Sequence, residues 1–292
     1  MVAAGYRPPW PGFATALGAN ATLAQSLRPF PQYLTGFGYN SDNNGNSLYH
    51  SLQTKVERRV GQGLNVLASY TWSKSISGPA DIGGAVGGGF YGAAPLNVYV
   101  PRTDRSLSLF DTPHRFVGTV LYDVPFFHSS SGFKKVLLDG VQVSTILSIV
   151  SGIPAGLTDT AQTTATGIAS RPDSVVGQKV SLGRSGRTPV AQFNTAAFTV
   201  AQPGEFGASP RTGAVRLPGL VNDDFSATKG VKFGESRNLQ IRADFFNLTK
   251  HYNPDPSTIG LARNAATFGK INNGLSGGFA TRVIQLGAKL YF

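Results

Sequence analysis

The chain alternates apolar and polar residues over long stretches, with a period of two. Between residues 64 and 72, for example, Leu64, Val66, Tyr70 and Trp72 occupy even positions, whereas most odd positions are polar. Such alternation is typical of a β-strand with one apolar and one polar face. It predicts seven strands, at residues 47–60, 64–72, 114–124, 140–152, 223–233, 237–248 and 281–292. A weaker alternation predicts an eighth strand at residues 32–39.

The predicted strands are long, at about 10 to 14 residues, whereas strands of soluble proteins usually have about five or six. A tilted strand needs ~9–11 residues to cross a bilayer. Strand length therefore favours the wall of an antiparallel transmembrane β-barrel over a soluble sandwich. The alternation and the strand length together predict an all-β membrane fold. No run approaches the roughly 18 consecutive apolar residues of a transmembrane helix, so none is expected.

The connections between these strands alternate in length. The shorter ones, at residues 61–63, 125–139 and 234–236, fall on one side of the predicted sheet, and the long ones, at 75–111, 153–222 and 249–280, fall on the other. Bacterial outer-membrane barrels have short periplasmic turns and longer extracellular loops. We therefore expect the long connections to be extracellular. The chain then divides into a poorly structured N-terminal lead-in at 1–46, which contains the weak strand, and a barrel segment at 47–292.

The last predicted strand alternates up to a C-terminal aromatic residue. This ending resembles the signal by which outer-membrane barrels engage the barrel assembly machinery. The alternative interpretation is the last strand of a soluble sheet that happens to end in Phe. The residues that would form the signal, on the lipid side of the strand, are Ile284, Leu286, Ala288, Leu290 and Phe292.

Composition supports a β-rich membrane protein. Charged residues make up only 14% of the chain, against about 25% in an average soluble domain, and the content of 36 glycines further disfavours a helical bundle. The net charge of +11 suggests a polyanionic neighbour. Because the positive charges are dispersed and form no basic run, we expect outer-membrane lipid and lipopolysaccharide as partners, and no nucleic acid.

Nothing in the sequence predicts an enzyme, a cofactor or a metal site. Cysteine is absent, and the four histidines are too scattered for a metal-binding motif. Residues 87–92 match a dinucleotide fingerprint and residues 274–278 match a nucleophile elbow, but neither lies in the required structural context. Asp111 and His114 could form an acid/base pair, although capping of a strand start is the favoured interpretation.

Two sets of side chains acquire roles if the strands form a barrel. Arg or Lys at the lipid midplane costs about 2–4 kcal/mol, so charged strand residues should face the lumen. The candidates for the lumen or for contact with a plug are Lys55, Glu57, Arg59, Gln240, Arg242 and Asp244. Aromatic residues near strand ends are typical of the girdles at the two membrane interfaces. The candidates for these girdles are Trp72, Phe116, Tyr122 and Phe233.

Five phrases occur in a characteristic order along the chain. They are Ser-Tyr-Thr-Trp-Ser-Lys at 69–74, Asp-Thr-Pro-His-Arg-Phe at 111–116, Ser-Gly-Ile-Pro at 151–154, Phe-Asn-Thr-Ala-Ala-Phe at 193–198 and Arg-Ala-Asp-Phe-Phe-Asn-Leu at 242–248. The series resembles the C-terminal barrel region of Oar-like TonB-dependent outer-membrane receptors of the Acidobacteria type. The resemblance implies a regulatory-like β-sandwich, then a plug, then a barrel of roughly 22 strands. This chain matches only the last third or so of that barrel.

The resemblance therefore implies a partial barrel with two open edges, located in the outer membrane of a Gram-negative bacterium. The N-terminus carries no signal peptide, so we expect an N-terminally truncated product or fragment. Its function would be that of a receptor wall for uptake of an unidentified ligand. A plug and the TonB system would interact with this protein only through the missing N-terminal part. The chain alone would not be able to transport a ligand. The alternative is a secreted or cell-surface β-sandwich module that binds glycans or protein through its loops.

Overall fold

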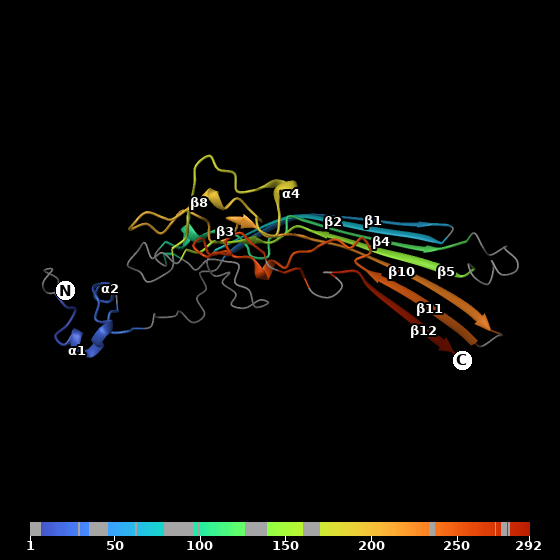
Figure 1. Cartoon of the computed structure of the whole chain (residues 1–292), viewed down its shortest axis with the longest axis horizontal. Coiled ribbons are helices and arrows are strands. Elements are labelled where there is room, and N and C mark those ends of the chain that lie inside the picture. Colours follow the sequence, from blue (N-terminus) through green and yellow to red (C-terminus); the bar gives the residue numbers. More distant parts are fainter. Residues whose placement is uncertain are drawn as a thin grey trace.

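A single long antiparallel sheet dominates the computed structural model (Figure 1). The structure describes residues 7–28, 30–34, 46–61, 63–78, 96–97, 100–125, 139–159, 170–233, 237–271, 273–275, 279 and 281–292. The sheet has the strand order β1-β2-β4-β5-β10-β11-β12, with the short β3 (Ser106–Leu107) paired to the end of β2. These strands are β1 (Ser47–Val60), β2 (Leu64–Ser77), β4 (His114–Asp123), β5 (Val141–Val150), β10 (Leu220–Phe233), β11 (Arg237–Phe246) and β12 (Val283–Tyr291).

All seven strands predicted from the alternation are confirmed, as is the all-β antiparallel class. β2 continues beyond its predicted end to Ser77, and β10 begins earlier than predicted, at Leu220. The weak eighth strand is wrong where it can be checked, because residues 32–34 lie in a turn and a bend. The rest of that prediction, residues 35–39, lies outside the described residues. The Tyr33 backbone N–H donates to the Phe30 carbonyl at 3.2 Å, and this local turn uses a donor that a strand would need for pairing.

Each long strand pairs with the next one along the chain, so the connections fall at two ends of the sheet. The strand ends joined by residues 61–63, 124–140 and 234–236 lie at one end of the sheet, which we call the turn end. Connections 78–113, 151–219 and 247–282 lie at the other, which we call the loop end. This agrees with the predicted sorting of shorter and longer connections. In the described part of the chain, β1 and β12 are the edges of the sheet and are not paired with each other.

The pairing register sorts side chains into two faces. Direct cross-strand partners run from Lys55 in β1 through Ser69, Val117 and Ser148 to Asn222 in β10. Because alternate residues of a strand point to opposite sides, these residues and their neighbours two and four positions away share one side. We call it the polar face, and we call the side that carries Val56 and Trp72 the apolar face.

The long connections fold into a compact region, the loop layer, made of residues 96–113, 151–159, 170–219 and 247–275 as far as these are described. It contains β6 (Pro154–Ala155), β7 (Asp173–Ser174), β8 (Phe198–Thr199), β9 (Val215–Arg216), α4 (Gly183–Gly186), η4 (Pro101–Asp104), η5 (Thr195–Ala197) and η6 (Pro256–Thr258). β6 pairs with β9, and β7 with β8. A hydrophobic core forms within it from Ala155, Leu157, Phe193, Ala197, Phe198, Val215, Leu217, Ile259 and Ile271.

The N-terminal residues form short helices before the sheet begins. These are α1 (Phe13–Leu17), η2 (Gly18–Asn20) and α2 (Leu23–Ser26). Thr22 caps α2, because its hydroxyl accepts a hydrogen bond from the Gln25 backbone N–H at 3.1 Å. None of the helices in the described part of the chain is long and apolar enough to cross a membrane.

The apolar face of the long sheet is not covered by a second sheet in the described residues. Leu52, Val56 and Trp72 are each more than half exposed, and Leu286 is 76% exposed. A sandwich would bury such side chains between two sheets about 10 Å apart. The fold therefore argues against the alternative of a β-sandwich module, and an exposed apolar face suits a sheet that borders lipid.

Candidate functional site

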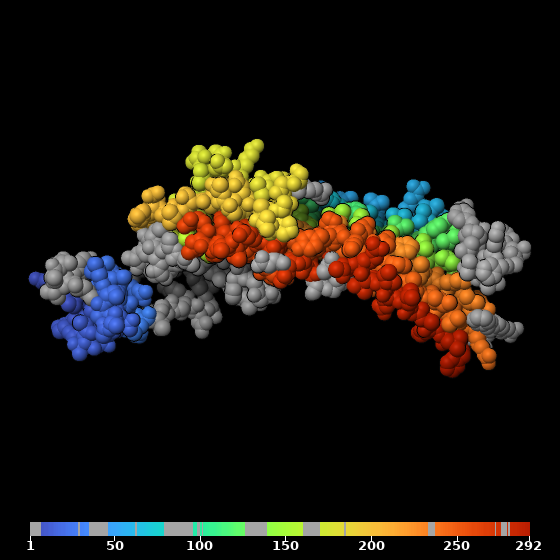
Figure 2. All heavy atoms as spheres, viewed as in Figure 1, coloured from blue at the N-terminus to red at the C-terminus, as the bar shows by residue number. Residues whose placement is uncertain are grey.

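The loop layer lies over the polar face at the loop end of the sheet. Ser73, Ser77 and Asn222, whose side chains belong to the polar face there, are all buried. Trp72, the neighbour of Ser73 on the apolar face, is 56% exposed. Figure 2 shows the segments around residues 190–219 and 250–271 packed together at this end, while the strands extend away from them. The loop layer therefore covers the polar face at the loop end of the sheet, whereas the apolar face there stays exposed.

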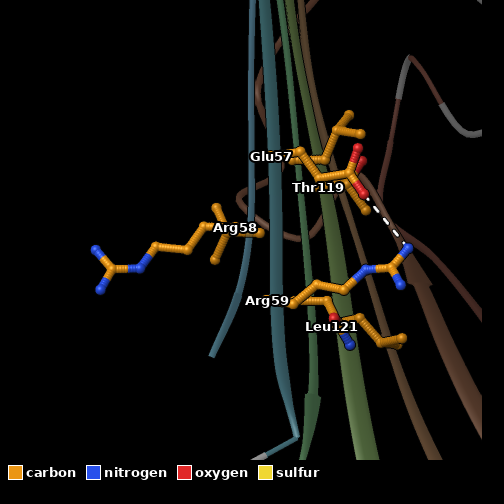
Figure 3. Close-up of a pocket in the computed structure, with 8 residues that line it drawn as sticks. Glu57, Arg58, Arg59, Thr119 and Leu121 are labelled. Carbon is orange, nitrogen blue, oxygen red and sulfur yellow. Dashed lines mark hydrogen bonds and ion pairs between the residues drawn. The ribbon is translucent and has the colours of Figure 1, made fainter. Parts of the chain in front are cut away.

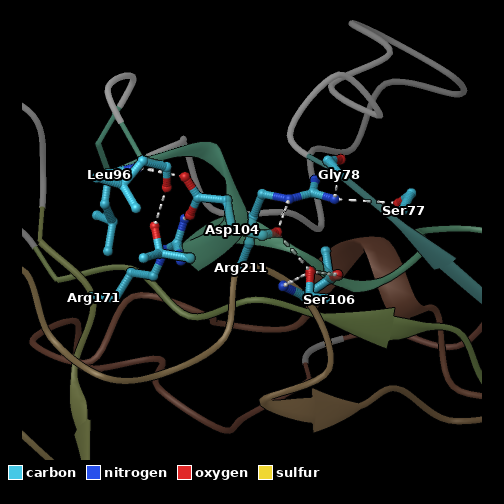
Figure 4. Close-up of polar contacts among 10 residues, drawn as sticks. Ser77, Gly78, Leu96, Asp104, Ser106, Arg171 and Arg211 are labelled. Atoms are coloured by element: carbon cyan, nitrogen blue, oxygen red, sulfur yellow. Dashed lines mark hydrogen bonds and ion pairs between the residues drawn. The ribbon is translucent and has the colours of Figure 1, made fainter. Parts of the chain in front are cut away.

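A buried ion pair is the centre of the loop layer. The Arg171 guanidinium donates to the Asp104 carboxylate at 2.5 Å, and the two side chains are only 2% and 1% exposed. The Leu96 backbone N–H donates to the second carboxylate oxygen at 3.2 Å (Figure 4). Burial lowers the pKa of Arg171, and the hydrogen bond and charge of Asp104 oppose that shift. The pair joins the connection after β2 to the connection after β5.

A second buried arginine fixes the same cluster to the sheet. Arg211 donates to the backbone carbonyls of Asp104 at 3.3 Å and Gly78 at 3.1 Å, and to the Ser77 hydroxyl at 3.4 Å (Figure 4). Because Ser77 ends β2, Arg211 holds the loop layer against the end of that strand. Multiple donors in a fixed fork make arginine suited to such a junction.

Two further Asp–Arg pairs join the long connections. Arg216 donates to the Asp111 carboxylate at 2.7 Å and also to the backbone carbonyls of Asp111 and Gly152. Arg263 pairs with the fully buried Asp159. The first pair links the connection after β2 to the one after β5, and the second links the connection after β5 to the one after β11. The three long connections are thus tied into one unit by charge.

Two buried asparagines anchor the third long connection. The Asn253 side chain accepts from the Val221 backbone N–H at 3.0 Å and donates to the carbonyls of Val221 and Phe279, each at 2.9 Å. Asn247 forms a local ring with the backbone of His251. Both asparagines are fully buried. Sequence reasoning missed them, since a single polar residue in a long connection breaks no alternating pattern.

The acid/base pair considered for Asp111 and His114 does not form. Asp111 pairs with Arg216 and accepts a hydrogen bond from the Ser75 backbone N–H at 2.7 Å. His114 Nδ1 and the Tyr70 hydroxyl share a hydrogen bond of 2.7 Å on the apolar face. Asp111 therefore holds the neighbouring strand β2 instead of capping its own.

The six candidates for the lumen all lie on the polar face by register. In β1, Lys55 and Arg59 both pair with Glu57, at 3.2 and 3.4 Å. In β11, Arg242 pairs with Asp244 at 2.8 Å. In the same strand, Gln240 accepts a hydrogen bond from the Tyr291 hydroxyl at 3.4 Å. The structure thus brings the candidates together in two groups, one on each flank of the sheet.

An open hollow of about 420 Å³ lies beside the β1 group. Its polar-face lining includes Glu57, Arg59, Thr119 and Leu121 (Figure 3). Arg58, one position along β1, directs its guanidinium to the opposite side of the strand. The hollow therefore places the Glu57–Arg59 ion pair beside apolar side chains such as Leu121, and its open shape suits a solvent-exposed surface more than a tight ligand pocket.

By register, Trp72, Phe116 and Tyr122 of the predicted girdle and the predicted assembly residues within β12 lie on the apolar face. Trp72 and Phe116 are near the loop end of their strands, and Tyr122 and Phe233 are near the turn end. For Phe233 the structure describes the backbone alone. The predicted assembly residues, Ile284, Leu286, Ala288 and Leu290 within β12 and Phe292 directly after it, share this face or continue its alternation. Their roles as girdle and assembly signal stay predictions.

The described residues contain no group of three or more His, Asp or Glu side chains that could hold a metal ion. The glycine motif at 87–92 and residues 276–278 of the second motif lie outside the described part of the chain. The site therefore consists of the charged and hydrogen-bonding side chains on the polar face and of a loop layer that is held together by ion pairs.

Comparison with known families agrees with this geometry. Residues 5–285 match the family described as outer membrane beta barrel domain. Searches of curated proteins and of solved structures give no match. Barrels of this kind are located in the bacterial outer membrane and are typically not enzymes. With the match covering nearly the whole chain, and with long antiparallel strands that have one apolar and one polar face, this protein belongs to the outer membrane β-barrel domain family.

Proposed function

We propose that the chain is the C-terminal part of the barrel wall of a TonB-dependent, Oar-like receptor that takes up a ligand into the periplasm. The observation that carries this proposal is the continuity of the polar face across all seven long strands, with charged side chains on both flanks. The assignment to the receptor family is supported by the resemblance of five ordered phrases, from residues 69–74 to residues 242–248, to Oar-like receptors. In this proposal, the polar face lines the lumen and the loop layer covers its extracellular mouth.

The mechanism of such a wall is passive. Lys55, Arg59 and Arg242 are held in pairs with carboxylates on the polar face, so each can exchange its partner for a polar group on a plug at little cost. Energy-coupled motion belongs to the plug and the TonB system. The apolar face meets lipid and lipopolysaccharide, and β12 engages the assembly machinery.

Cysteine labelling tests the orientation of the faces, and the chain is suited to it because it has no cysteine. Adjacent variants form matched pairs: Lys55→Cys with Val56→Cys, and Arg242→Cys with Ile241→Cys. In outer membranes, a charged maleimide should react at least about tenfold faster with Lys55→Cys and Arg242→Cys, since a thiol in lipid is rarely a thiolate. Equal rates within both pairs would contradict a lumen-facing polar face.

Photo-crosslinking tests the receptor part of the proposal. A benzophenone amino acid at Lys55 or Arg242, in the outer membrane of the bacterium that makes the protein, should yield an adduct with a plug-like polypeptide. The same group at Val56 or Ile241 should give lipid adducts instead. Lys55→Leu and Arg242→Leu should weaken plug docking. A lumen that yields no polypeptide adduct would identify an open barrel and overturn the receptor assignment.

A further inference from the structure

A lysine and two histidines lie close together on the apolar face of the first three long strands, at the loop end. Lys74 in β2 is the direct cross-strand partner of His50 in β1, and both side chains are exposed. On the next rung of the same face, Trp72 is the partner of the exposed His114 in β4. A lysine opposite a histidine brings no opposite charge to the pair. The pair thus lacks a negative partner across the two strands.

No carboxylate of these three strands balances the pair. The acidic residues of β1, β2 and β4 are Glu57 and Asp123, and both belong to the polar face by register. Asp111 accepts a hydrogen bond from the backbone of β2, but its carboxylate is already paired with Arg216. Among the described residues, Lys74 has no ion-pair partner. A positive charge therefore stays uncompensated on a face that borders lipid.

The hydrogen bond between Tyr70 and His114 turns that histidine into a further donor. The Tyr70 hydroxyl and His114 Nδ1 lie 2.7 Å apart, and the two rings are stacked with 6.2 Å between their centroids. When the hydroxyl donates, Nε2 carries the ring proton and can donate to a group outside the protein. Together with the Lys74 ammonium and an N–H of His50, this makes three donors on one surface. Donors of this kind bind phosphate.

The position of Lys74 along β2 places it at a membrane interface. The next cation on this face of β1 is Arg58, whose guanidinium points away from the polar face (Figure 3). Its partner in β2 is Val66. From position 66 to position 74 a strand rises by about 27 Å, or about 20 Å across a membrane at the tilt of barrel strands. The apolar band of such barrels is about 25 Å tall, so Lys74 and Arg58 reach opposite interfaces.

The loop end determines which lipid Lys74 meets. The long connections leave the sheet at this end and are expected to be extracellular. The outer leaflet of the outer membrane consists of lipopolysaccharide, whose lipid A carries phosphate groups at the boundary between sugar and acyl chains. Basic surfaces at this depth bind anionic head groups. The exposed ring of Trp72 beside Lys74 is typical of the same boundary.

We infer that His50, Lys74 and His114 form a binding site for a phosphate group of lipopolysaccharide on the lipid-facing side of the barrel. The Lys74 ammonium and the two imidazole N–H groups donate to the phosphate oxygens. The acyl chains lie against the apolar face between this site and the turn end. The inference rests on the proposed contact of the apolar face with lipopolysaccharide, and it requires neither a plug nor the TonB system.

Binding of purified lipopolysaccharide to the full chain in detergent micelles tests the inference, after extraction from outer membranes and removal of bound lipid. The unmodified protein should bind lipopolysaccharide at least about tenfold more tightly than enzymatically dephosphorylated lipopolysaccharide, because the charge-assisted hydrogen bonds are lost. The double variant His50→Gln/Lys74→Gln should bind both forms alike. Arg58→Gln is the matched control, since it removes a cation from the same face of β1 at the turn end, and it should keep the full preference.

The inference is wrong if the unmodified protein binds both forms equally, a comparison that needs no variant to fold. It is also wrong if the double variant keeps the preference, or if Arg58→Gln loses it as well. Lys74→Arg keeps the charge and should retain most of the preference. Displacement of lipopolysaccharide by inorganic phosphate at equal phosphorus concentration would overturn the inference too, because it would identify a site for the free anion.

The same measurement separates this inference from the receptor proposal. Absence of plug adducts at Lys55 and Arg242 together with an intact phosphate preference would refute the receptor proposal alone. Plug adducts without a phosphate preference would refute the lipopolysaccharide site alone.

Discussion

The long sheet and the loop layer solve the problem of burying apolar surface in opposite ways. In the described residues, every buried hydrophobic side chain lies outside the seven long strands, and most belong to the loop layer. The strands leave Leu52, Trp72 and Leu286 exposed. A water-soluble sheet would gain about 25 cal/mol for each Å² of this surface that it buried. The loop layer therefore buries its apolar side chains in a core, as water-soluble proteins do. The apolar face of the sheet has no such core and borders lipid instead.

The two regions also use charge differently. In the loop layer, Asp104 and Arg171 are almost fully buried and join segments far apart in sequence. On the sheet, Lys55 and Glu57 are neighbours on one strand, with side chains 62% and 43% exposed. Exposed pairs contribute little to stability, whereas breaking a buried pair leaves an uncompensated charge. Charge therefore holds the long connections together in the loop layer, whereas the exposed ion pairs on the polar face contribute little to the stability of the sheet.

The largest expected effect is in the loop layer. Asp104→Ala leaves the Arg171 guanidinium buried without its carboxylate, and it should destabilise the layer by about 3–5 kcal/mol. Limited proteolysis of the refolded protein should show cleavage within 96–113 or 170–219 that the unmodified protein resists, while the long strands stay protected. The matched change on the sheet, Glu57→Ala, should leave the protease pattern unchanged. Equal sensitivity of the two variants would contradict the division into two regions.

The next effect concerns the sheet and its two faces. Ala227 and Ser226 are small neighbours in β10, on the apolar and polar faces respectively. Ala227→Arg places a cation in lipid and should cost about 2–4 kcal/mol, whereas Ser226→Arg should cost much less because it faces water. Urea unfolding of the full chain in lipid vesicles measures both. A similar loss for the two variants would mean that the faces do not border different solvents.

The contrast between the regions also decides what sequence reasoning can find. The alternation from Leu64 to Trp72 identified a strand and its faces, because a strand repeats every two residues and the same signal recurs along its length. The six lumen candidates were assigned to one side by the same rule, and the register places them there. Periodicity thus predicts the strands, their two faces and the positions of the long and short connections between them.

The loop layer has no such regularity. Asp104 and Arg171 are 67 positions apart, and Asp111 and Arg216 are 105 apart. No spacing rule connects residues at these separations, so the sequence favours capping of a strand start by Asp111, with His114 as an alternative acid/base partner, and does not indicate Arg216. The core residues around Phe193 are likewise spaced irregularly. Ion pairs and core contacts of this kind can be identified only in the folded structure, where the three long connections pack together.

A smaller effect is expected at the junction between the regions. Asn253→Ala removes three hydrogen bonds to Val221 and Phe279 and should cost about 1–3 kcal/mol through the unsatisfied backbone groups. Hydrogen exchange at the start of β10 should accelerate, while the centre of β10 keeps its protection. The exposed Asn273→Ala should change stability by no more than about 0.5 kcal/mol. If both variants exchange alike, Asn253 does not anchor the third connection to the sheet.

The smallest change tests the boundary between water and lipid without altering stability. In a Trp10→Phe background, Trp72 is the remaining tryptophan, and its exposed ring is near the loop end of the apolar face. Brominated lipid should quench its fluorescence most strongly when the bromine is near the headgroups, because aromatic girdles sit at that depth. Thr71→Trp combined with Trp72→Phe moves the indole to the polar face, where aqueous acrylamide should quench it instead. If acrylamide quenches both tryptophans equally, the apolar face near Trp72 borders water, and the contrast between sheet and loop layer does not extend to this end of β2.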